Sequence, residues 1–275
     1  MGLLTNIFLK MPQHSKEEKL KAFGELLDVV DTLREKCPWD AAQTNESIRP
    51  NTIEEVMELA EAITVNDSNN IRKELGDVLL HVLFYAKFGD EKQEFDIADV
   101  CDSLREKLIF RHPHIYGDIS ASDAQQVLQN WELIKMKEKD GNKTVLSGVP
   151  RALPSLIKAE RIQEKAANVG FDWEQKEHVW AKVQEEMQEV EAEMKSGNES
   201  NREKEFGDLL FAVVNAARLY GVHPDNALEK TNQKFIARFN YIEEQTNLQG
   251  RKMGEITLNE MDNLWNEAKK LHLGE

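Results

Sequence analysis

An acidic pattern that occurs twice with the same internal spacing constrains this chain more than any other feature. The first copy lies at residues 54–58 (EEVME), followed by residues 74–77 (ELGD). The second lies at residues 185–189 (EEMQE), followed by residues 205–208 (EFGD). In both copies the aspartate of the second segment lies 19 positions after the last glutamate of the first. We therefore expect two divergent copies of one structural unit.

The residues around both acidic patterns indicate helices. Proline is absent from residues 51–112 and 155–223, and both stretches are rich in Glu, Lys, Leu and Ala with apolar residues at helical spacing. We predict an all-α fold of two tandem helical-bundle units, with a loop from Cys37 to about Pro50. The helices are expected at about 15–36, 52–64, 71–89, 97–111 and 122–137, and at about 155–168, 178–195, 202–220, 225–246 and 258–271.

A segment rich in glycine and proline separates the two halves. Residues 138–154 hold Gly141, Gly148, Pro150 and Pro154 among small polar residues, a composition typical of a domain boundary. We expect an N-terminal domain at 1–140, a linker at 141–154 and a C-terminal domain at 155–275.

The overall charge limits the classes of partner. The 275 residues carry a formal charge of −15, which argues against binding to a nucleic-acid polymer or an anionic membrane. The two cysteines are too few and too scattered for a disulfide framework, which fits a reducing compartment. No apolar run approaches the ~20 residues of a membrane span. We expect a cytoplasmic protein.

Each acidic helix, taken alone, looks like an ordinary solvated face. Its acids fall opposite its apolar residues, as on any amphipathic surface helix. The helix that follows is different, because residues 78–86 (VLLHVLFYA) and 209–214 (LLFAVV) are apolar around nearly the whole circumference. Such a helix must be buried. The two acids at its start, three residues apart on one face, therefore need a cation, a proton or strong donors.

A short polar turn should fold the two helices of each copy against one another and bring four carboxylates together. In the first copy these are Glu55, Glu58, Glu74 and Asp77. They would repel unless divalent ions lay between them, and oxygen-only ligands indicate Mg²⁺ or Mn²⁺. A di-iron centre needs Glu-x-x-His pairs, which neither copy has. His81 is expected to be a core residue or a support for the metal ligands.

Basic residues recur beside the acids at matching places in the two halves. They are Lys107 and Arg111 in the first half, and Lys182, Lys230, Lys234 and Arg238 in the second. Solvated surface residues are the plain alternative, but recurrence beside a carboxylate cluster favours phosphate contacts. Trp131 and Trp265 close the two units at matching points and could either stack on a base or pack. No phosphate-binding glycine-rich loop is present.

Several segments together resemble the MazG family of nucleoside triphosphate pyrophosphohydrolases. They are CPWD at 37–40 with Gln43-Thr44, the doubled acidic pattern at 54–77 and 185–208, RHPH at 111–114, and VGFDW at 169–173. The resemblance runs in order from about residue 17 to residue 271. The acidic pattern alone is shared with the wider all-α pyrophosphohydrolase superfamily, whereas its tandem arrangement with CPWD and VGFDW is much narrower.

The resemblance implies Mg²⁺-dependent hydrolysis of nucleoside triphosphates to monophosphate and pyrophosphate on a homodimer of helical bundles. It places metal ligands at Glu186, Glu189, Glu205 and Asp208, and nucleotide contacts at Lys182, Glu185, Lys234, Arg238 and Trp265. The first unit matches at Glu54, Glu55, Glu58, Glu74, Asp77, Lys107, Arg111 and Trp131. It departs at Asn51, which stands where the second unit has Lys182.

The mechanism that follows is water attack at the α-phosphorus. The metal would activate the water, and Glu185 or one of the metal-bound glutamates would orient or deprotonate it. The lysines and Arg238 would stabilise the phosphate oxygens. Two alternatives remain: a narrower pyrophosphatase acting on dUTP, dCTP or a phosphoribosyl-nucleotide, and a helical interaction protein without activity.

Overall fold

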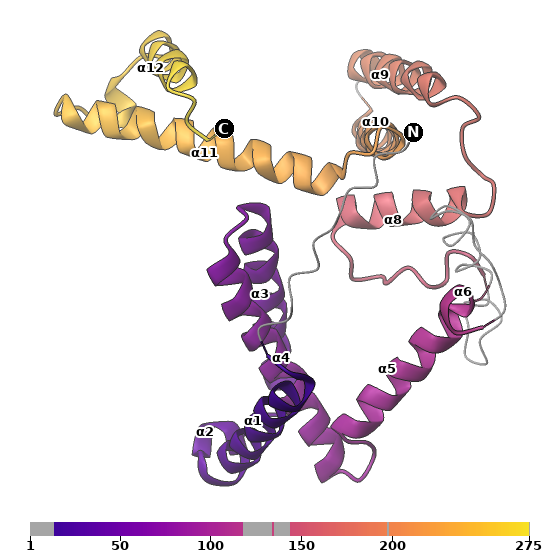
Figure 1. The fold of residues 1–275 in the computed structure, drawn as a ribbon. Helices are drawn as coiled ribbons and strands as arrows, with labels where there is room; N and C mark the ends of the chain where they lie inside the picture. The colour runs from indigo at the N-terminus through magenta and orange to yellow at the C-terminus, as the bar shows by residue number, and fades with distance from the viewer. Residues whose placement is uncertain (1–13, 118–133, 135–143, 197, 275) are drawn as a thin grey trace, which may run out of the picture. The chain divides into compact units, whose positions relative to one another are not determined.

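The structure is a computed structural model that describes residues 14–117, 134, 144–196 and 198–274 (Figure 1). Every regular element in this part of the chain is helical, so the predicted all-α fold is confirmed. The chain forms two compact units, Met1–Phe110 and Arg111–Glu275. The helix expected at 122–137 falls largely outside the described residues. The linker expected at 141–154 is described from residue 144 and forms turns up to the start of α8 at Ser155, and the domain limits stay predictions. None of the described helices has the length and apolarity to cross a membrane.

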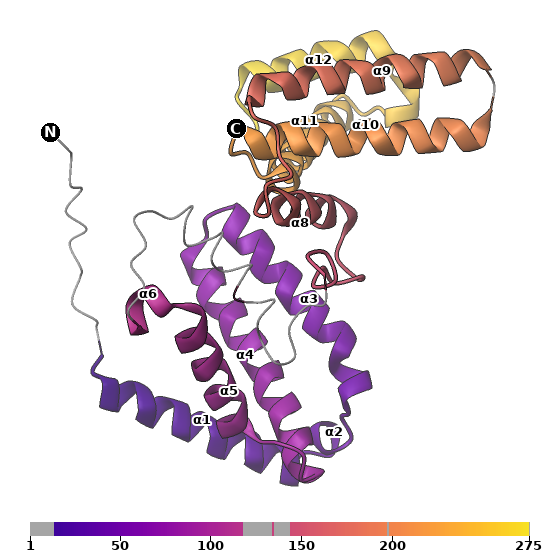
Figure 2. The same ribbon diagram turned by 90° about the vertical axis from the view of Figure 1, so that its right-hand side faces the viewer.

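The N-terminal unit is built on an antiparallel pair of long helices (Figure 2). Its elements are α1 (Lys16–Lys36), α2 (Pro38–Ala41), α3 (Asn45–Thr64), α4 (Ser68–Glu91) and α5 (Ile97–Arg111). Helices α3 and α4 pack along one another, and α1 crosses α4. Ile48, Phe84 and Phe88 form the buried centre of this packing. The acidic pattern lies on this pair, EExxE on α3 and ExxD on α4.

The second unit repeats the pair and adds helices to it. Its elements are α6 (Pro113–Tyr116), α8 (Ser155–Ala167), the 3₁₀ turn η1 (Lys176–His178), α9 (Val179–Ser196), α10 (Glu199–Leu219), α11 (Pro224–Leu248), η2 (Met253–Glu255) and α12 (Leu258–Lys270). Helices α9 and α10 pack along one another as α3 and α4 do, α8 lies against α10 and α11, and α12 folds back on α11. Val179, Val183, Ala212 and Ala216 form a buried cluster between α9 and α10.

The loop expected up to Pro50 is wrong, because α3 already begins at Asn45 and contains Pro50. A capping box starts the helix early: Ser47 N donates to Thr44 Oγ1 at 3.2 Å, and Thr44 N donates to Ser47 Oγ at 2.8 Å. This box satisfies two of the amide groups that the first turn leaves free. Pro50 is the sixth residue of α3 and lies inside the helix, where it lacks the N–H that would bond to the carbonyl of Glu46.

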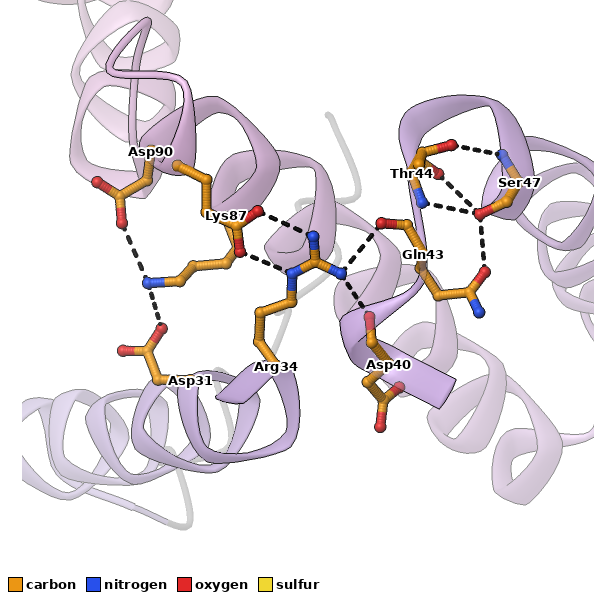
Figure 3. Close-up of polar contacts among 9 residues, drawn as sticks. Asp31, Arg34, Asp40, Gln43, Thr44, Ser47, Lys87 and Asp90 are labelled. Carbon is orange, nitrogen blue, oxygen red and sulfur yellow. Dashed lines mark hydrogen bonds and ion pairs between the residues drawn. The ribbon is translucent and has the colours of Figure 1, made fainter. Parts of the chain in front are cut away.

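Arg34 joins the helices of the N-terminal unit through the CPWD segment (Figure 3). Its guanidinium donates to both carboxylate oxygens of Glu91, at 2.6 and 2.9 Å, and to the backbone carbonyls of Asp40 and Gln43. It also lies 4.7 Å from the centre of the Phe88 ring. The hydrogen bond from Arg34 lowers the pKa of the Glu91 carboxyl. The end of α1, the CPWD turn and the end of α4 are therefore fastened at one side chain.

Replacing Arg34 by Met should lower the free energy of unfolding of the N-terminal unit by about 2 kcal/mol, because two backbone acceptors and one carboxylate lose a charged donor. Urea denaturation followed by circular dichroism measures this change, and hydrogen exchange at α1 and α4 assigns it to this unit. Arg105→Met is the matched control, since Arg105 is 61% exposed and pairs with Asp102 and Glu106 of its own helix. Equal losses in the two variants would contradict the bridging role of Arg34.

Candidate metal centre

Acids from both helices of the α9–α10 pair meet in the second unit. Carboxylate oxygens of Glu186 on α9 and of Glu205 and Asp208 on α10 lie within 4.8 Å of one another. Glu186 is 5% exposed and Glu205 is 9% exposed. Glu189, the fourth predicted acid, lies close enough for the charge of Glu186 to raise its pKa, with loss of solvent and a hydrogen bond to Glu205 adding to the effect. The structure thus brings three of the four predicted acids within 4.8 Å of one another, and Glu189 lies near them.

The first unit repeats the arrangement on α3 and α4. Oxygens of Glu55, Glu58 and Glu74 lie within 4.8 Å of one another, and Glu74 is 4% exposed. Burial raises the pKa of Glu55, and the charges of Asp77, Glu58 and Glu74 raise it further. The doubled sequence pattern therefore corresponds to a doubled cluster in space.

The turn between the two helices of each pair aligns the acids. Asp67 caps α4, because its side chain accepts from the backbone N–H groups of Asn69 and Asn70. Asn198 caps α10 in the same way, accepting from Asn201 N at 3.3 Å. Each cap fixes where the second helix starts, so its Glu and Asp, three residues apart, face the EExxE helix from the same side.

The donor set suits a hard divalent cation. All candidate ligand atoms are carboxylate oxygens, which Mg²⁺, Mn²⁺ and Ca²⁺ prefer over softer metals. In addition, Glu74 Oε2, Glu186 Oε2 and Glu205 Oε2 are buried and accept no hydrogen bond from the described residues. Buried unsatisfied carboxylate oxygens are costly. A cation bound between the helices would satisfy them, so the residues present fit such an ion.

Lysines supply positive charge to the same carboxylates. Lys182 Nζ lies 2.7 Å from Glu186 Oε1 and 3.0 Å from Glu185 Oε1. These hydrogen bonds, first that to Glu186 and then that to Glu185, raise the pKa of Lys182 above its ordinary value, so it stays a cation at neutral pH. The predicted position of Lys182 beside the acids is thus observed. Asn51, at the matching place on α3, cannot supply this charge.

The sequence analysis missed a second lysine in each unit. Lys73 Nζ lies 2.8 Å from Glu74 Oε1, and Lys204 Nζ lies 3.0 Å from Glu205 Oε1. Each also approaches the following aspartate, at 3.9 Å for Asp77 and 3.6 Å for Asp208. The sequence could have predicted both lysines, because residues 73–77 and 204–208 share the pattern K-E-x-G-D.

His81 has a partner that explains its place in the first unit. Its Nδ1 lies 2.8 Å from Thr52 Oγ1, which lies 2.7 Å from the Tyr85 hydroxyl. Partial burial lowers the pKa of His81. In the second unit Ala212 holds the matching position. Neither cluster of acids includes a histidine, in keeping with the expectation that His81 supports the core.

The basic and aromatic residues predicted on α11 and α12 gather around one another. Arg238 is buried, donates to the carbonyl of Leu273 at 3.3 Å, and lies 5.7 Å from the centre of the Trp265 ring. That ring packs against Phe235 at 5.1 Å. Lys230 is exposed and Lys234 is half-buried on the same helix. Their predicted contacts with nucleotide stay predictions.

For the remaining predicted residues of the first half, the structure gives a position on a helix but no contact with the acids. Glu54 is exposed on α3, Lys107 is exposed on α5, and Arg111 ends α5 at the border of the two units. Trp131 lies outside the described residues. The roles assigned to these four residues stay predictions.

A cavity of about 730 Å³ adjoins the acids of the second unit. Lys182, Glu186 and Asp208 line it, together with Gln163 of α8 and Asn215 of α10. Gln163 and Asn215 were missed because only the crossing of α8 over α10, which no local pattern encodes, brings them to the acids. The cavity gives the cluster a neighbouring space large enough for a small molecule.

Comparisons with known proteins agree with this geometry. The sequence matches the family model of the MazG nucleotide pyrophosphohydrolase domain at residues 43–116 and again at 174–242. It is 41% identical to the "Nucleoside triphosphate pyrophosphohydrolase" of Escherichia coli K12, over 91% of this chain and 98% of that protein. It is 43% identical to the "Nucleoside triphosphate pyrophosphohydrolase/pyrophosphatase MazG" of Thermotoga maritima, over 90% and 95%. It is also 46% identical to "Uncharacterized protein YabN" of Bacillus subtilis, over 93% of this chain and 53% of that protein.

Proposed function

Because the chain belongs to the MazG nucleotide pyrophosphohydrolase family, we propose that it is a magnesium-dependent hydrolase that converts nucleoside triphosphates to the monophosphate and pyrophosphate. The observation that carries the proposal is the pair of buried oxygens on Glu186 and Glu205 that accept no hydrogen bond from the described residues, with Asp208 beside them. A triphosphate is a polyanion, and a chain of charge −15 can bind it only where cations outweigh the acids locally.

We assign the reaction to the C-terminal unit. There Lys182 adds a cation at the carboxylates, whereas Asn51 stands at the matching place in the first unit. The cavity of about 730 Å³ also opens on the second cluster. The first unit keeps its acids, so it can bind a metal without turning over the same substrate.

Each side chain of the site has a proposed role in the reaction. Bound Mg²⁺ would neutralise phosphate charge and lower the pKa of a coordinated water. Glu186, Glu189, Glu205 and Asp208 would hold the metal. Lys182 would contact phosphate oxygens by charge-assisted hydrogen bonds, as Lys230, Lys234 and Arg238 would from α11. Glu185, exposed one turn before Glu189, would orient the water or accept its proton, so that the water attacks the α-phosphorus and pyrophosphate leaves.

The products identify the bond that is cleaved. Incubating the full chain with each nucleoside triphosphate and Mg²⁺ should yield the monophosphate and pyrophosphate in equal amounts, because attack occurs at the α-phosphorus. Separation of the nucleotides by ion-exchange chromatography, with a pyrophosphate assay alongside, measures both. Nucleoside diphosphate with orthophosphate would refute this chemistry. Turnover of dUTP or dCTP alone would narrow the enzyme to the alternative substrate class.

The chain is also proposed to act as a homodimer. Phe206, Leu210 and Val213 are exposed on α10 at positions four and three residues apart, so they form one apolar stripe. Apolar stripes of this kind mark surfaces that another chain covers. Sedimentation velocity of the full chain gives the oligomeric state directly.

A cytoplasmic location is proposed from the cysteines. Cys37 and Cys101 are both free thiols, as expected where glutathione and thioredoxin keep thiols reduced. Nucleoside triphosphates are found in the same compartment, which supports the assignment.

A further inference from the structure

Residues 271–274 follow α12 and lie against α11, the helix that carries Lys234 and Arg238. We call these four residues the return segment. Helix α12 folds back on α11 (Figure 1), and the return segment contacts α11 near its middle, at residues 234–238. It is therefore in a position to affect the basic side chains of that helix.

Backbone hydrogen bonds fix the path of the return segment. His272 N donates to the carbonyl of Lys269 at 3.2 Å, and Leu273 N donates to the carbonyl of Ala268 at 3.2 Å. His272 has φ +56°. These features form a Schellman motif, in which a residue of left-handed conformation reverses the chain at the end of a helix. The motif brings Leu273 from the end of α12 to α11.

The carbonyl of Leu273 accepts a hydrogen bond from Arg238. The donor is Nε, at 3.3 Å, and the guanidinium carbon lies 5.7 Å from the centre of the Trp265 ring on α12. Arg238 is 6% exposed, and a buried cation is costly unless acceptors hold it. The carbonyl and the face of the indole ring are two of the contacts that hold this guanidinium.

Gly274 lets the return segment approach α11 closely. A Cβ atom at this residue would lie 2.7 Å from the Cα of Lys234 and 3.2 Å from the Cβ of Ala237. The Cα of a helix cannot move aside as the end of a flexible side chain can, so a larger residue would push the segment away from α11. In addition, Gly274 has φ +76°, a conformation that favours glycine. Position 274 therefore requires glycine for two separate reasons.

We propose that the return segment is a positioning element for the substrate, and that it holds the guanidinium of Arg238 in place before a triphosphate binds. An arginine side chain loses rotational freedom when it contacts a phosphate, and this loss weakens binding. A guanidinium that is already held loses less. Leu273 and Gly274 are thus positioning residues that act through Arg238. The inference rests on the proposed function, since Arg238 is one of the proposed phosphate contacts.

Two substitutions test the inference by crowding the contact from its two sides in the full chain. Gly274→Ala adds a methyl group against α11, and Ala237→Val adds methyl groups against the return segment. We expect each to raise the KM for ATP about tenfold with kcat changed less than about twofold, because ground-state binding is weakened and the chemical step is not. Steady-state release of pyrophosphate measures both constants, and thermal unfolding followed by circular dichroism shows that the variants fold.

Arg238→Met distinguishes positioning from a general effect on the fold. If the return segment acts through this side chain, Gly274→Ala should raise KM no further once Arg238 has been replaced, so the two effects are not additive. Additive effects in the double variant would overturn the proposal. An unchanged KM in Arg238→Met alone would also overturn it, because the segment would then hold a side chain that the substrate does not need.

Gly250→Ala and Gly254→Ala are the matched controls. Gly250 has φ +69°, and a Cβ atom there would meet nothing within 4 Å, so this alanine introduces backbone strain without a clash. Gly254 also faces open space, and its φ is not positive. Both variants should keep the KM of the unmodified chain.

The results distinguish failure of this inference from failure of the proposed function. If the unmodified chain releases no pyrophosphate with Mg²⁺, the proposed function falls first. If it is active and both Gly274→Ala and Ala237→Val keep its KM, only this inference falls. A lower KM in these variants would mean that the return segment obstructs the substrate, which also contradicts a positioning role. Ala237→Val decides the outcome should Gly274→Ala fail to fold.

Discussion

Replacing Asp208 by Asn should reduce Mg²⁺-dependent pyrophosphate release about 100- to 1000-fold. Asp208 is exposed at the edge of the cluster, and its oxygens lie within 4.8 Å of those of Glu186 and Glu205. The amide keeps the shape of the side chain but removes one negative ligand from the metal. Metal-ion stabilisation of a phosphoryl transition state amounts to several kcal/mol, and each ~1.4 kcal/mol corresponds to a factor of ten in rate. Steady-state release of pyrophosphate from ATP or GTP measures the loss.

Two further variants show where the loss originates. Asp262→Asn changes an exposed aspartate on α12 that lies outside the cluster, and turnover should be unaffected. Asp77→Asn makes the same change in the first unit, and we expect a smaller loss than in Asp208→Asn. A greater loss in Asp77→Asn would assign turnover to the N-terminal unit, and unchanged rates in Asp208→Asn would remove this cluster from the reaction.

Magnesium should stabilise the folded chain even when no nucleotide is present. A ligand at 100 times its Kd adds about 2.7 kcal/mol to the free energy of unfolding, which corresponds to a rise in Tm of about 5–10 °C for a unit of this size. The reason is the set of carboxylates whose buried oxygens accept no hydrogen bond from the part of the chain that the structure describes. Differential scanning calorimetry with MgCl₂, and then with excess EDTA, measures the shift and its reversal.

Ionic strength must be separated from specific binding in that experiment. NaCl at equal ionic strength screens carboxylate repulsion without filling the site, so it should raise Tm much less than MgCl₂. Glu205→Gln should reduce the magnesium shift. If NaCl and MgCl₂ act equally on both proteins, the clusters are solvated acidic faces, and the interpretation as an interaction protein gains support.

Features set by short-range spacing could be predicted from the sequence. The three-residue separation of Glu205 and Asp208 places both on one face of a helix, and the polar turn around Asn198 is too short for anything but an antiparallel return. The apolar sequence after each ExxD motif required burial. These three facts together predict the meeting of the acids, and the same reasoning holds for the first unit.

Features set by long-range contacts could not be predicted. The hydrogen bond from Gln163 to Phe211 spans 48 residues, and that from Arg34 to Glu91 spans 57. No periodicity within one helix encodes such crossings, because they depend on how whole helices pack. The start of α3 was predicted wrongly for a different reason. Proline usually marks a helix boundary, but the Thr44–Ser47 capping box starts α3 before Pro50.

Lys73 and Lys204 have a consequence for how the protein assembles. Each is adjacent in sequence to the glutamate that it pairs with. The lysine and the glutamate are therefore synthesised one after the other. A nascent helical hairpin can therefore close before it has captured any ion from the surroundings. Under the proposed metal dependence, folding and metal loading would be separable events, and a shortage of the metal would leave a folded, inactive chain.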